Sequence, residues 1–491
     1  MIVKGSLRAA LLLAAWLGNG LWLHAADWPQ WLGPERDAVW RETGILRKFS
    51  TNGPSFRWRT PIGSGYAGPA VAQGRVYVAD RVRGTERVLC LKEADGTILW
   101  EHADDCPYVV SYPAGPRATP LVDQDKVYTL GAEDHLCCLD AGSGKVLWSR
   151  ALKKDFGLST PLWGFAGHPL VEGNKLICLV GGEGSVAVAF DKNTGRELWR
   201  ALSAKEPGYA PPMICEAGGR RQLIVWHPES LNSLDLDTGR VFWTQPFARR
   251  VGLCVSTPRQ LGDLRFVTAF YNGPLMMRLD PTEPTAKVLW RGKSSSEQKT
   301  DGLHSIISTP FLEDGHIYGV CSYGQLRCLK ADTGERLWET FAATTDGQPV
   351  RWANAFLIKN GEVFFLPNEK GDLIIARLSP RGYEELSRAH LLEPANRDCG
   401  RNVVVASGLC QPLHLRPQRP GDHLRVAGSG EVGPPERGSD ITSPASAAYR
   451  PVPSSQRRGA TLPARSRQSR TRRSSQRPRP SAPTTAGACR R

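Results

Sequence analysis

The chain has 491 residues, of which 41% are apolar and 23% charged, so most of it is expected to fold as a globular protein. No apolar run of about 18 residues follows the N-terminal segment, which excludes a multi-span membrane protein. The net charge of +15 would suggest nucleic-acid binding, but residues 403–491 hold 16 Arg, no Lys and four acidic residues and contribute +12 of it. Residues 1–402 carry only +3, and we expect no nucleic-acid partner.

The first 26 residues have the pattern of a secretory signal peptide. Lys4 and Arg8 form a basic start, residues 9–23 are apolar, and Ala25 and Ala26 offer a small-residue cleavage site. We expect cleavage, which would leave no transmembrane span and an exported protein in the periplasm or outside the cell; an uncleaved anchor is the alternative. Export would permit disulfides among the 12 Cys, with their pairing left open.

Tryptophan recurs at near-constant intervals of 42 to 51 residues. A turn precedes most of these residues, as in Leu139, Asp140 and Gly144 before Trp148; the copy at Leu279 has a two-residue insertion and no Gly. A wedge between adjacent sheets is the simplest role for such a residue, because burying an indole removes on the order of 150–250 Å² from water. The residues expected to act as wedges are Trp58, Trp100, Trp148, Trp199, Trp243, Trp290 and Trp338.

A second landmark advances with the first. A small residue, usually followed by Pro, opens each unit, as at Thr119-Pro120, and the unit that follows contains four short apolar segments separated by turn residues, at 119–122, 126–131, 135–139 and 146–149. Repeats of this length with four strands predict an all-β propeller with seven readable blades. Trp58 stands in a segment resembling a last strand with no strands before it, so the plan is eight blades with the final one disrupted.

The motif of Asp, Thr-Gly and Leu-Trp, as at Asp191, Thr194, Gly195 and Trp199, resembles the repeats of pyrroloquinoline quinone (PQQ)-like propellers. This family includes quinoprotein alcohol dehydrogenases and the outer-membrane assembly factor BamB. The segment DWPQWLGP at 27–34 resembles the start of exported planctomycete-type members. The resemblance covers about residues 27 to 402 and implies the fold more than an activity.

The expected organisation is a signal peptide (1–26), an N-terminal arm (27–57), the propeller (58–402) and a tail (403–491). The tail contains 12 Pro, 12 Ser and no Trp, so it should be disordered. An eighth blade should begin there. Shifted by one base, residues 405–425 can encode WHPAFANRCIYARNDREIIC, which has the His-Pro opening and a following strand. We therefore interpret the tail as read out of frame, with a natural basic tail as the alternative.

The resemblance raises PQQ with Ca²⁺ as a cofactor, held by oxygen ligands and served by a catalytic Asp. The residues provide no such set, and the catalytic residues stay unknown. Cys137-Cys138 could form the vicinal disulfide that some such dehydrogenases stack on PQQ, but Cys138 lies ten residues before its Trp, as do Cys90 and Cys328, which favours an ordinary strand position. The ten His show no metal-ligand spacing, so no metal site is expected.

A ligand would bind at the mouth of the central channel, near the innermost strands. Position alone selects the candidates, which are Tyr66, Arg117, Trp163, His168, Tyr209, His304, Trp352 and Asn354. Packing or loop roles are the alternative for each. Trp163 is the most informative, because an aromatic loop before a strand packs poorly unless it covers something.

We expect an exported monomer with a binding or scaffolding role in the cell envelope, rather than an enzyme, with an envelope protein or a small ligand as partner. A PQQ-dependent alcohol dehydrogenase-type oxidoreductase is the first alternative. A propeller that binds carbohydrate or the cell surface through its aromatic mouth is the second.

Overall fold

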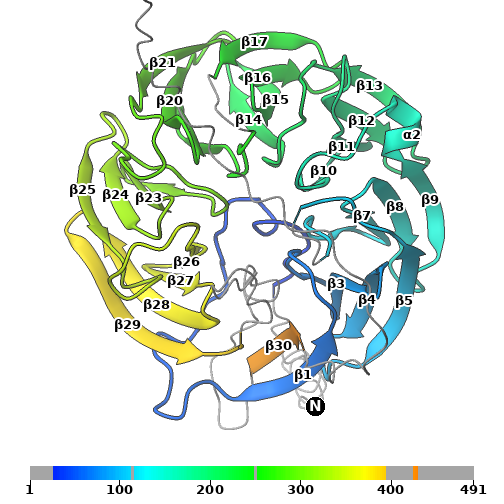
Figure 1. Cartoon of the computed structure of the whole chain (residues 1–491), viewed down its shortest axis with the longest axis horizontal. Coiled ribbons are helices and arrows are strands. Elements are labelled where there is room, and N and C mark those ends of the chain that lie inside the picture. The colour runs from blue at the N-terminus through cyan, green and yellow to red at the C-terminus, as the bar shows by residue number, and fades with distance from the viewer. Residues whose placement is uncertain (1–25, 112–114, 248–251, 394–423, 430–491) are drawn as a thin grey trace, which may run out of the picture. The chain divides into compact units, whose positions relative to one another are not determined.

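The repeats form a ring of seven four-stranded antiparallel sheets in the computed structural model (Figure 1). The structure describes residues 26–111, 115–247, 252–393 and 424–429, the last segment by its backbone alone. Residues 430–491 lie outside this range. Within each sheet the strands follow chain order, because antiparallel neighbours can be joined by tight turns. The predicted propeller is confirmed.

The seven sheets are numbered here as blades 1 to 7 in chain order. Blades 1 to 4 consist of β2 (Ala70–Ala72), β3 (Arg75–Val82), β4 (Thr85–Lys92) and β5 (Ile98–Asp105); β6 (Leu121–Asp123), β7 (Lys126–Leu130), β8 (His135–Asp140) and β9 (Val146–Ala151); β10 (Leu170–Glu172), β11 (Lys175–Leu179), β12 (Ala187–Asp191) and β13 (Glu197–Ala201); and β14 (Met213–Ala217), β15 (Arg220–His227), β16 (Ser230–Asp235) and β17 (Val241–Pro246). Blades 5 to 7 consist of β18 (Arg259–Leu261), β19 (Leu264–Ala269), β20 (Gly273–Leu279) and β21 (Ala286–Arg291); β22 (Phe311–Glu313), β23 (His316–Val320), β24 (Leu326–Lys330) and β25 (Arg336–Thr340); and β26 (Ile358–Asn360), β27 (Val363–Pro367), β28 (Asp372–Ser379) and β29 (Gly382–His390). One short helix, α2 (Leu152–Phe156), follows β9.

Most of the core lies between the sheets, and one further cluster includes Trp28, Trp31 and Trp40 inside the ring. One buried cluster joins Tyr128 and Cys138 of blade 2 to Leu176 and Phe190 of blade 3, and other clusters join other neighbouring blades. Blades 2 to 6 therefore bury both faces against neighbouring blades, as stacked repeats require, whereas the free faces of blades 1 and 7 pack against β1 and the residues before it.

The repeated indoles reach across these interfaces. Six of the seven donate the ring N–H to a main-chain oxygen of the next sheet at 2.8–3.2 Å, as Trp100 does to Ala141 at 3.1 Å. The turn glycine of the next blade makes room for the ring: Gly144 has φ +72°, and a Cβ there would lie 2.5 Å from Trp100. Because an L side chain would be both strained and obstructed there, the Gly and the Trp of the motif form one packing unit.

Blade 5, which has the insertion and no turn glycine, is the exception. The indole N–H of Trp243, directed from blade 4 toward it, is buried without a hydrogen-bond partner. The inserted turn packs against blade 4 instead, where a Cβ on Gly218 would lie 2.2 Å from the carbonyl carbon of Glu283.

The ring is not completed by an eighth four-stranded sheet within the described residues. β1 (Phe56–Ile62) pairs in parallel with β30 (Leu424–Ser429), whereas the outermost strand of each complete blade pairs antiparallel with the third. β30 belongs to the segment expected to be disordered. Residues 394–423, where the rest of an eighth blade should stand, lie outside the described residues.

Candidate functional site

The N-terminal arm lies inside the ring, where Figure 1 shows it in blue at the centre. Trp28 exchanges two main-chain hydrogen bonds with Val71 of the innermost strand β2, at 2.7 and 2.9 Å. Further along the arm, the Trp40 N–H donates to the carbonyl of Lys359 in β26 at 2.7 Å. The arm therefore links blade 1 to blade 7 along the channel wall.

Two arm side chains attach it to the blades between. The Trp31 ring stacks on His168 with centroids 4.2 Å apart and planes 5° apart, and its N–H donates to Thr257 Oγ1 at 3.0 Å. Arg36 is buried and donates to the carbonyl of Pro169 at 2.9 Å. Burial lowers the pKa of Arg36 to about 9. His168, one of the expected ligand-binding residues, is thus covered by the arm.

Four other expected residues meet in the loops just before the innermost strands. The Arg117 guanidinium lies 5.0 Å from the centre of the Tyr66 ring, and its Nε donates to the carbonyl of Trp163 at 3.0 Å. The Trp163 and Tyr209 rings pack edge to face, with centroids 5.7 Å apart. Loops of blades 1 to 4 are therefore joined by one aromatic and cationic cluster. Burial lowers the pKa of Arg117, which acts here by binding loops together.

Exposed apolar residues adjoin this cluster. Val109 is 80% exposed and Leu162 is 51% exposed, and the Ser111 N–H donates to the carbonyl of Leu162 at 3.1 Å. Beneath them Glu133 accepts bonds from the Val109 N–H at 2.7 Å and the Thr160 hydroxyl at 2.6 Å. Burial acts to raise the Glu133 pKa, but these bonds and Lys153 lower it. An ionised carboxylate therefore holds two loops that present apolar side chains to solvent.

The remaining expected residues lie in loops of later blades. His304 is buried, with Nδ1 3.3 Å from the Phe270 carbonyl oxygen and Nε2 3.4 Å from Asp301; burial lowers its pKa. The Arg351 guanidinium lies 4.7 Å from the Trp352 ring. Asn354 is 2% exposed, and neither atom of its side-chain amide has a hydrogen-bond partner among the described residues.

Val109, Leu162 and Glu133 are not among the residues predicted from the sequence. Their function depends on exposure and on contacts between loops of different blades, which residue spacing does not encode. The available signal was apolar residues beside prolines, in Pro107 to Val110 and Pro161 to Trp163.

The described residues do not fit a calcium-bound quinone. Cys137 and Cys138 are free and point to opposite faces of β8, Cys137 toward blade 1 and Cys138 toward blade 3, so they do not form a disulfide platform. Cys138 pairs with Trp148 in the sheet, as Cys90 does with Trp100 and Cys328 with Trp338. A hard cation prefers oxygen donors, whereas the donor cluster found in the described part of the chain combines His102, Asp104 and Cys137.

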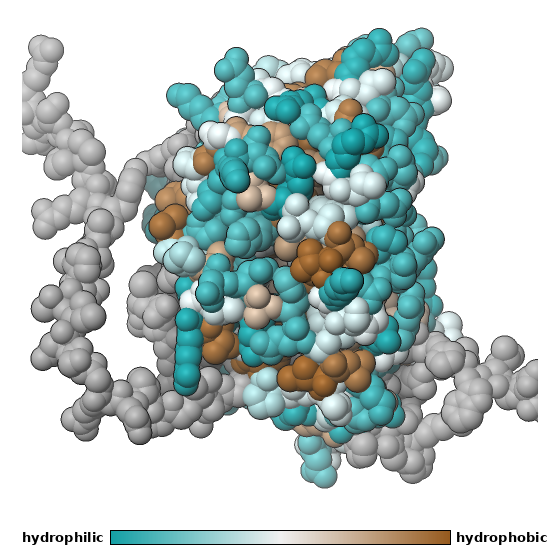
Figure 2. Space-filling view, turned by 90° about the vertical axis from the view of Figure 1, so that its right-hand side faces the viewer, coloured by the Kyte–Doolittle hydropathy of each residue, from teal (hydrophilic) through white to brown (hydrophobic). Residues whose placement is uncertain are grey.

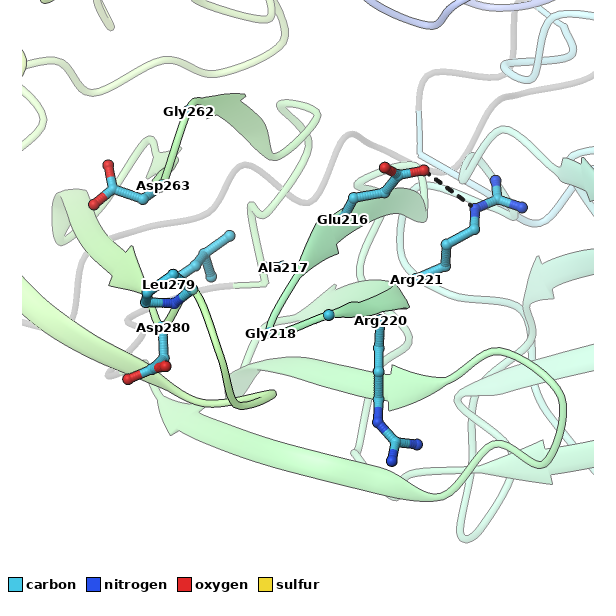
Figure 3. A pocket seen from close by; sticks show the side chains of 11 residues that line it. Glu216, Ala217, Gly218, Arg220, Arg221, Gly262, Asp263, Leu279 and Asp280 are labelled. Atoms are coloured by element: carbon cyan, nitrogen blue, oxygen red, sulfur yellow. Dashed lines mark ion pairs between the residues drawn. The ribbon is translucent and has the colours of Figure 1, made fainter.

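Other surface features lie on the rim. Figure 2 shows a mostly hydrophilic side with separate hydrophobic patches, and exposed apolar residues at the start of outermost strands include Ile98, Leu99 and Leu147. A cavity of about 490 Å³ lies between blades 4 and 5 (Figure 3). Its wall carries Glu216 and Arg221, whose charged atoms lie 3.7 Å apart, beside the inserted turn of blade 5.

Within the described ranges, no helix is both long and apolar enough to cross a membrane.

This ring of four-stranded repeats, with indole wedges and an internal arm, defines a PQQ-like β-propeller. The family model "Outer membrane protein assembly factor BamB" matches residues 86–284 and 227–390, and the chain belongs to that family.

Individual relatives are more distant. The chain is 24% identical over 269 residues to BamB of Yersinia pestis, covering 52% of this chain and 61% of the relative. It is 25% identical over 227 residues to BamB of Burkholderia pseudomallei, covering 45% and 54%. The match thus spans less than two thirds of either relative.

Two solved structures share the fold. Quinohemoprotein alcohol dehydrogenase from Comamonas testosteroni superposes with a TM-score of 0.54 at 15% identity, covering 75% of this chain and 74% of that one. A europium-containing methanol dehydrogenase gives 0.53 at 14% identity, covering 76% and 86%. Identities this low establish common architecture and leave activity open.

Proposed function

We propose that this chain is an exported scaffold that binds a protein partner in the cell envelope during outer membrane protein assembly. The curated relatives named as outer membrane protein assembly factors support the setting. The predicted signal peptide at residues 1–26 supports export.

The observation that carries the binding role is the exposed apolar pair Val109 and Leu162 beside the half-buried Trp163. Loops that hold such residues out toward solvent, rather than inside, present an interaction surface. The Glu133 carboxylate and Arg117 fix these loops through hydrogen bonds to main-chain groups. A fixed surface loses little conformational entropy when a partner binds.

The arm favours a protein over a small molecule. The arm covers His168 and bonds to Val71 and Lys359 of the innermost strands, so it occupies space inside the ring that a small ligand would need. A partner would therefore bind to residues outside the arm. Exposed aliphatic residues such as Val109 and Leu162 suit a protein surface, whereas small ligands take deep pockets.

The test is capture by photocrosslinking. A photoreactive amino acid at position 109, which is exposed beside Leu162, should give a discrete crosslinked partner when the full exported chain is mixed with envelope extract. Leu162→Asp should weaken capture at least about tenfold, as loss of an anchor residue does. Ile98→Asp is the matched control, because Ile98 is exposed to a similar degree on the rim.

Capture that Leu162→Asp leaves unchanged would contradict the proposed face, and absence of any stable partner would contradict the scaffold. Dye reduction with alcohols after addition of PQQ and Ca²⁺ would instead favour the dehydrogenase, and saturable glycan binding would favour the carbohydrate binder. N-terminal sequencing of the protein from the periplasmic fraction tests export, with Asp27 as the expected first residue.

A further inference from the structure

Three different metal-binding side chains converge where blade 1 meets blade 2. His102 and Asp104 come from β5, the outermost strand of blade 1, and Cys137 comes from β8 of blade 2. One donor atom of each lies within 4.8 Å of the other two, and His102 Nε2 is 2.9 Å from Asp104 Oδ2.

Strand alternation explains why they share an interface. Side chains two residues apart point to the same face of a strand, so His102 and Asp104 face blade 2 along with the wedge Trp100, whose N–H donates to Ala141 there. Cys137 belongs to the buried cluster between blades 1 and 2.

The other interfaces provide an internal comparison, because the repeat places equivalent residues at each. Two of these positions lie two and four residues after the wedge Trp of one blade. The third lies in the next blade, one residue before the residue that pairs with that blade's own wedge Trp. Between blades 2 and 3, and between blades 3 and 4, they hold Arg150, Leu152 and Val188, and Ala201, Ser203 and Asn232. Neither set combines an imidazole, a carboxylate and a thiol, so the blade pattern itself does not require this combination.

A fourth donor stands on the same face of β8. His135 lies two residues before Cys137, and its Nδ1 is buried without a hydrogen-bond partner. An unsatisfied buried ring nitrogen is costly unless it gains a partner.

We propose that His102, Asp104 and Cys137 bind Zn²⁺ between blades 1 and 2, and that the His135 ring, which lies outside this donor set and has its Nε2 3.7 Å from Asp134, moves in to become the fourth ligand. Zinc accepts sulfur, nitrogen and oxygen donors in tetrahedral sites with bonds of about 2.0–2.3 Å, which places neighbouring donor atoms about 3.5 Å apart. The three donor atoms lie within 4.8 Å of one another, so the side chains need to move only slightly closer together to reach that geometry. A bound ion would join the edge strand of one blade to the next.

The experiment titrates the purified full chain, stripped of metal, with Co²⁺ and then Zn²⁺. Tetrahedral cobalt bound to a thiolate gives visible d–d bands and a thiolate-to-cobalt band in the near ultraviolet. We expect both bands to saturate at one cobalt per chain and to disappear when Zn²⁺ is added. Cys137→Ala should abolish the thiolate band, and His102→Gln should raise the cobalt Kd at least about tenfold.

Cys138→Ala is the matched control, because it makes the same change one residue away on the opposite face of β8 and should keep the band. Near-ultraviolet circular dichroism of the tryptophans shows whether each variant is folded. If Cys137→Ala does not fold, His102→Gln decides alone, since that side chain is only half-buried. The proposal is overturned if the wild-type chain takes up no stoichiometric cobalt, if the thiolate band persists in folded Cys137→Ala, or if His102→Gln binds cobalt as tightly as the wild type.

Discussion

The indole N–H of Trp58 donates to the carbonyl of Glu93 at 2.9 Å, although β1 is not part of a complete blade. Its ring lies against Gly96, just as the Trp100 ring lies against Gly144 of the next blade. The wedge at the start of the chain therefore reproduces the contact of an outermost strand, and it holds β1 on blade 1 where a missing neighbour would stand.

This contact predicts that Gly96→Ala destabilises the ring more than the backbone alone would explain. Gly96 has φ +76°, and a Cβ there would lie 2.5 Å from the Trp58 ring. A left-handed Ala costs about 1–2 kcal/mol, and overpacking adds about 1–3 kcal/mol. Gly173→Ala is the control, because Gly173 has φ +58° with nothing within 4 Å of the added Cβ. Urea unfolding should show a larger loss of unfolding free energy for Gly96→Ala than for Gly173→Ala. Equal losses would mean that the Trp58 side chain moves aside at no energetic cost.

The exceptional wedge predicts an unequal pair of Trp→Phe substitutions. Trp290 donates to Ala331 at 2.8 Å, whereas the Trp243 N–H is buried without a partner. Trp290→Phe loses the bond and leaves the Ala331 carbonyl unpaired, which costs about 1–3 kcal/mol. Trp243→Phe removes an unsatisfied donor and should cost less by about 1 kcal/mol. Thermal unfolding of both variants measures the difference, and a larger loss for Trp243→Phe would contradict it.

The fold could be predicted from the repeat, because each Trp and its turn recur along the chain and mark one blade. The insertion at Leu279 was also visible, and it coincides with the one wedge whose N–H lacks a partner. The side-chain contacts of the candidate sites could not be predicted in the same way. The cover that Trp31 forms over His168, and the donor set of His102 and Cys137, join residues from different units whose sequence separation carries no period.

The arm should be released from the channel by a single substitution. Trp31→Ala removes the stack on His168 and the hydrogen bond to Thr257, and truncating a buried Trp costs about 3–5 kcal/mol. Because most of that loss falls on the arm, local opening should increase before the blades unfold. Limited proteolysis should cut within residues 27–49 at least about tenfold faster, while Trp163→Ala at the mouth should leave the arm protected. Unchanged cleavage in Trp31→Ala would show that the main-chain bonds and Arg36 are enough to hold the arm.

Glu369 should make stability fall with rising pH. Burial in the turn after β27 raises its pKa from 4.5 to about 8. Between these values the unfolded chain has lost the proton and the folded chain keeps it, so the free energy of unfolding decreases as pH rises through that window and then levels off. Glu369→Gln should lack this component, so its advantage over the wild type should grow from about pH 4.5 to 8. Urea midpoints across that range measure it, with the exposed Glu362→Gln as control. A constant difference between Glu369→Gln and the wild type would contradict the assignment.

The reading frame of the tail gives the last prediction. β1 pairs with β30 in parallel, unlike any outermost strand of the seven complete blades, and residues 403–423 lie outside the described residues. Sequencing the DNA at codons 403–406 should show one base that shifts the frame. A chain with the frame restored should supply strands for an antiparallel partner to β1, since an unpaired edge is a liability in a closed ring. Its β1 amides, from Phe56 to Ile62, should then exchange hydrogen more slowly than in the present chain, while those of β5 keep their rate. An uninterrupted frame at those codons, or unchanged exchange in β1, would mean that the Arg-rich tail is native and that seven blades are the complete ring.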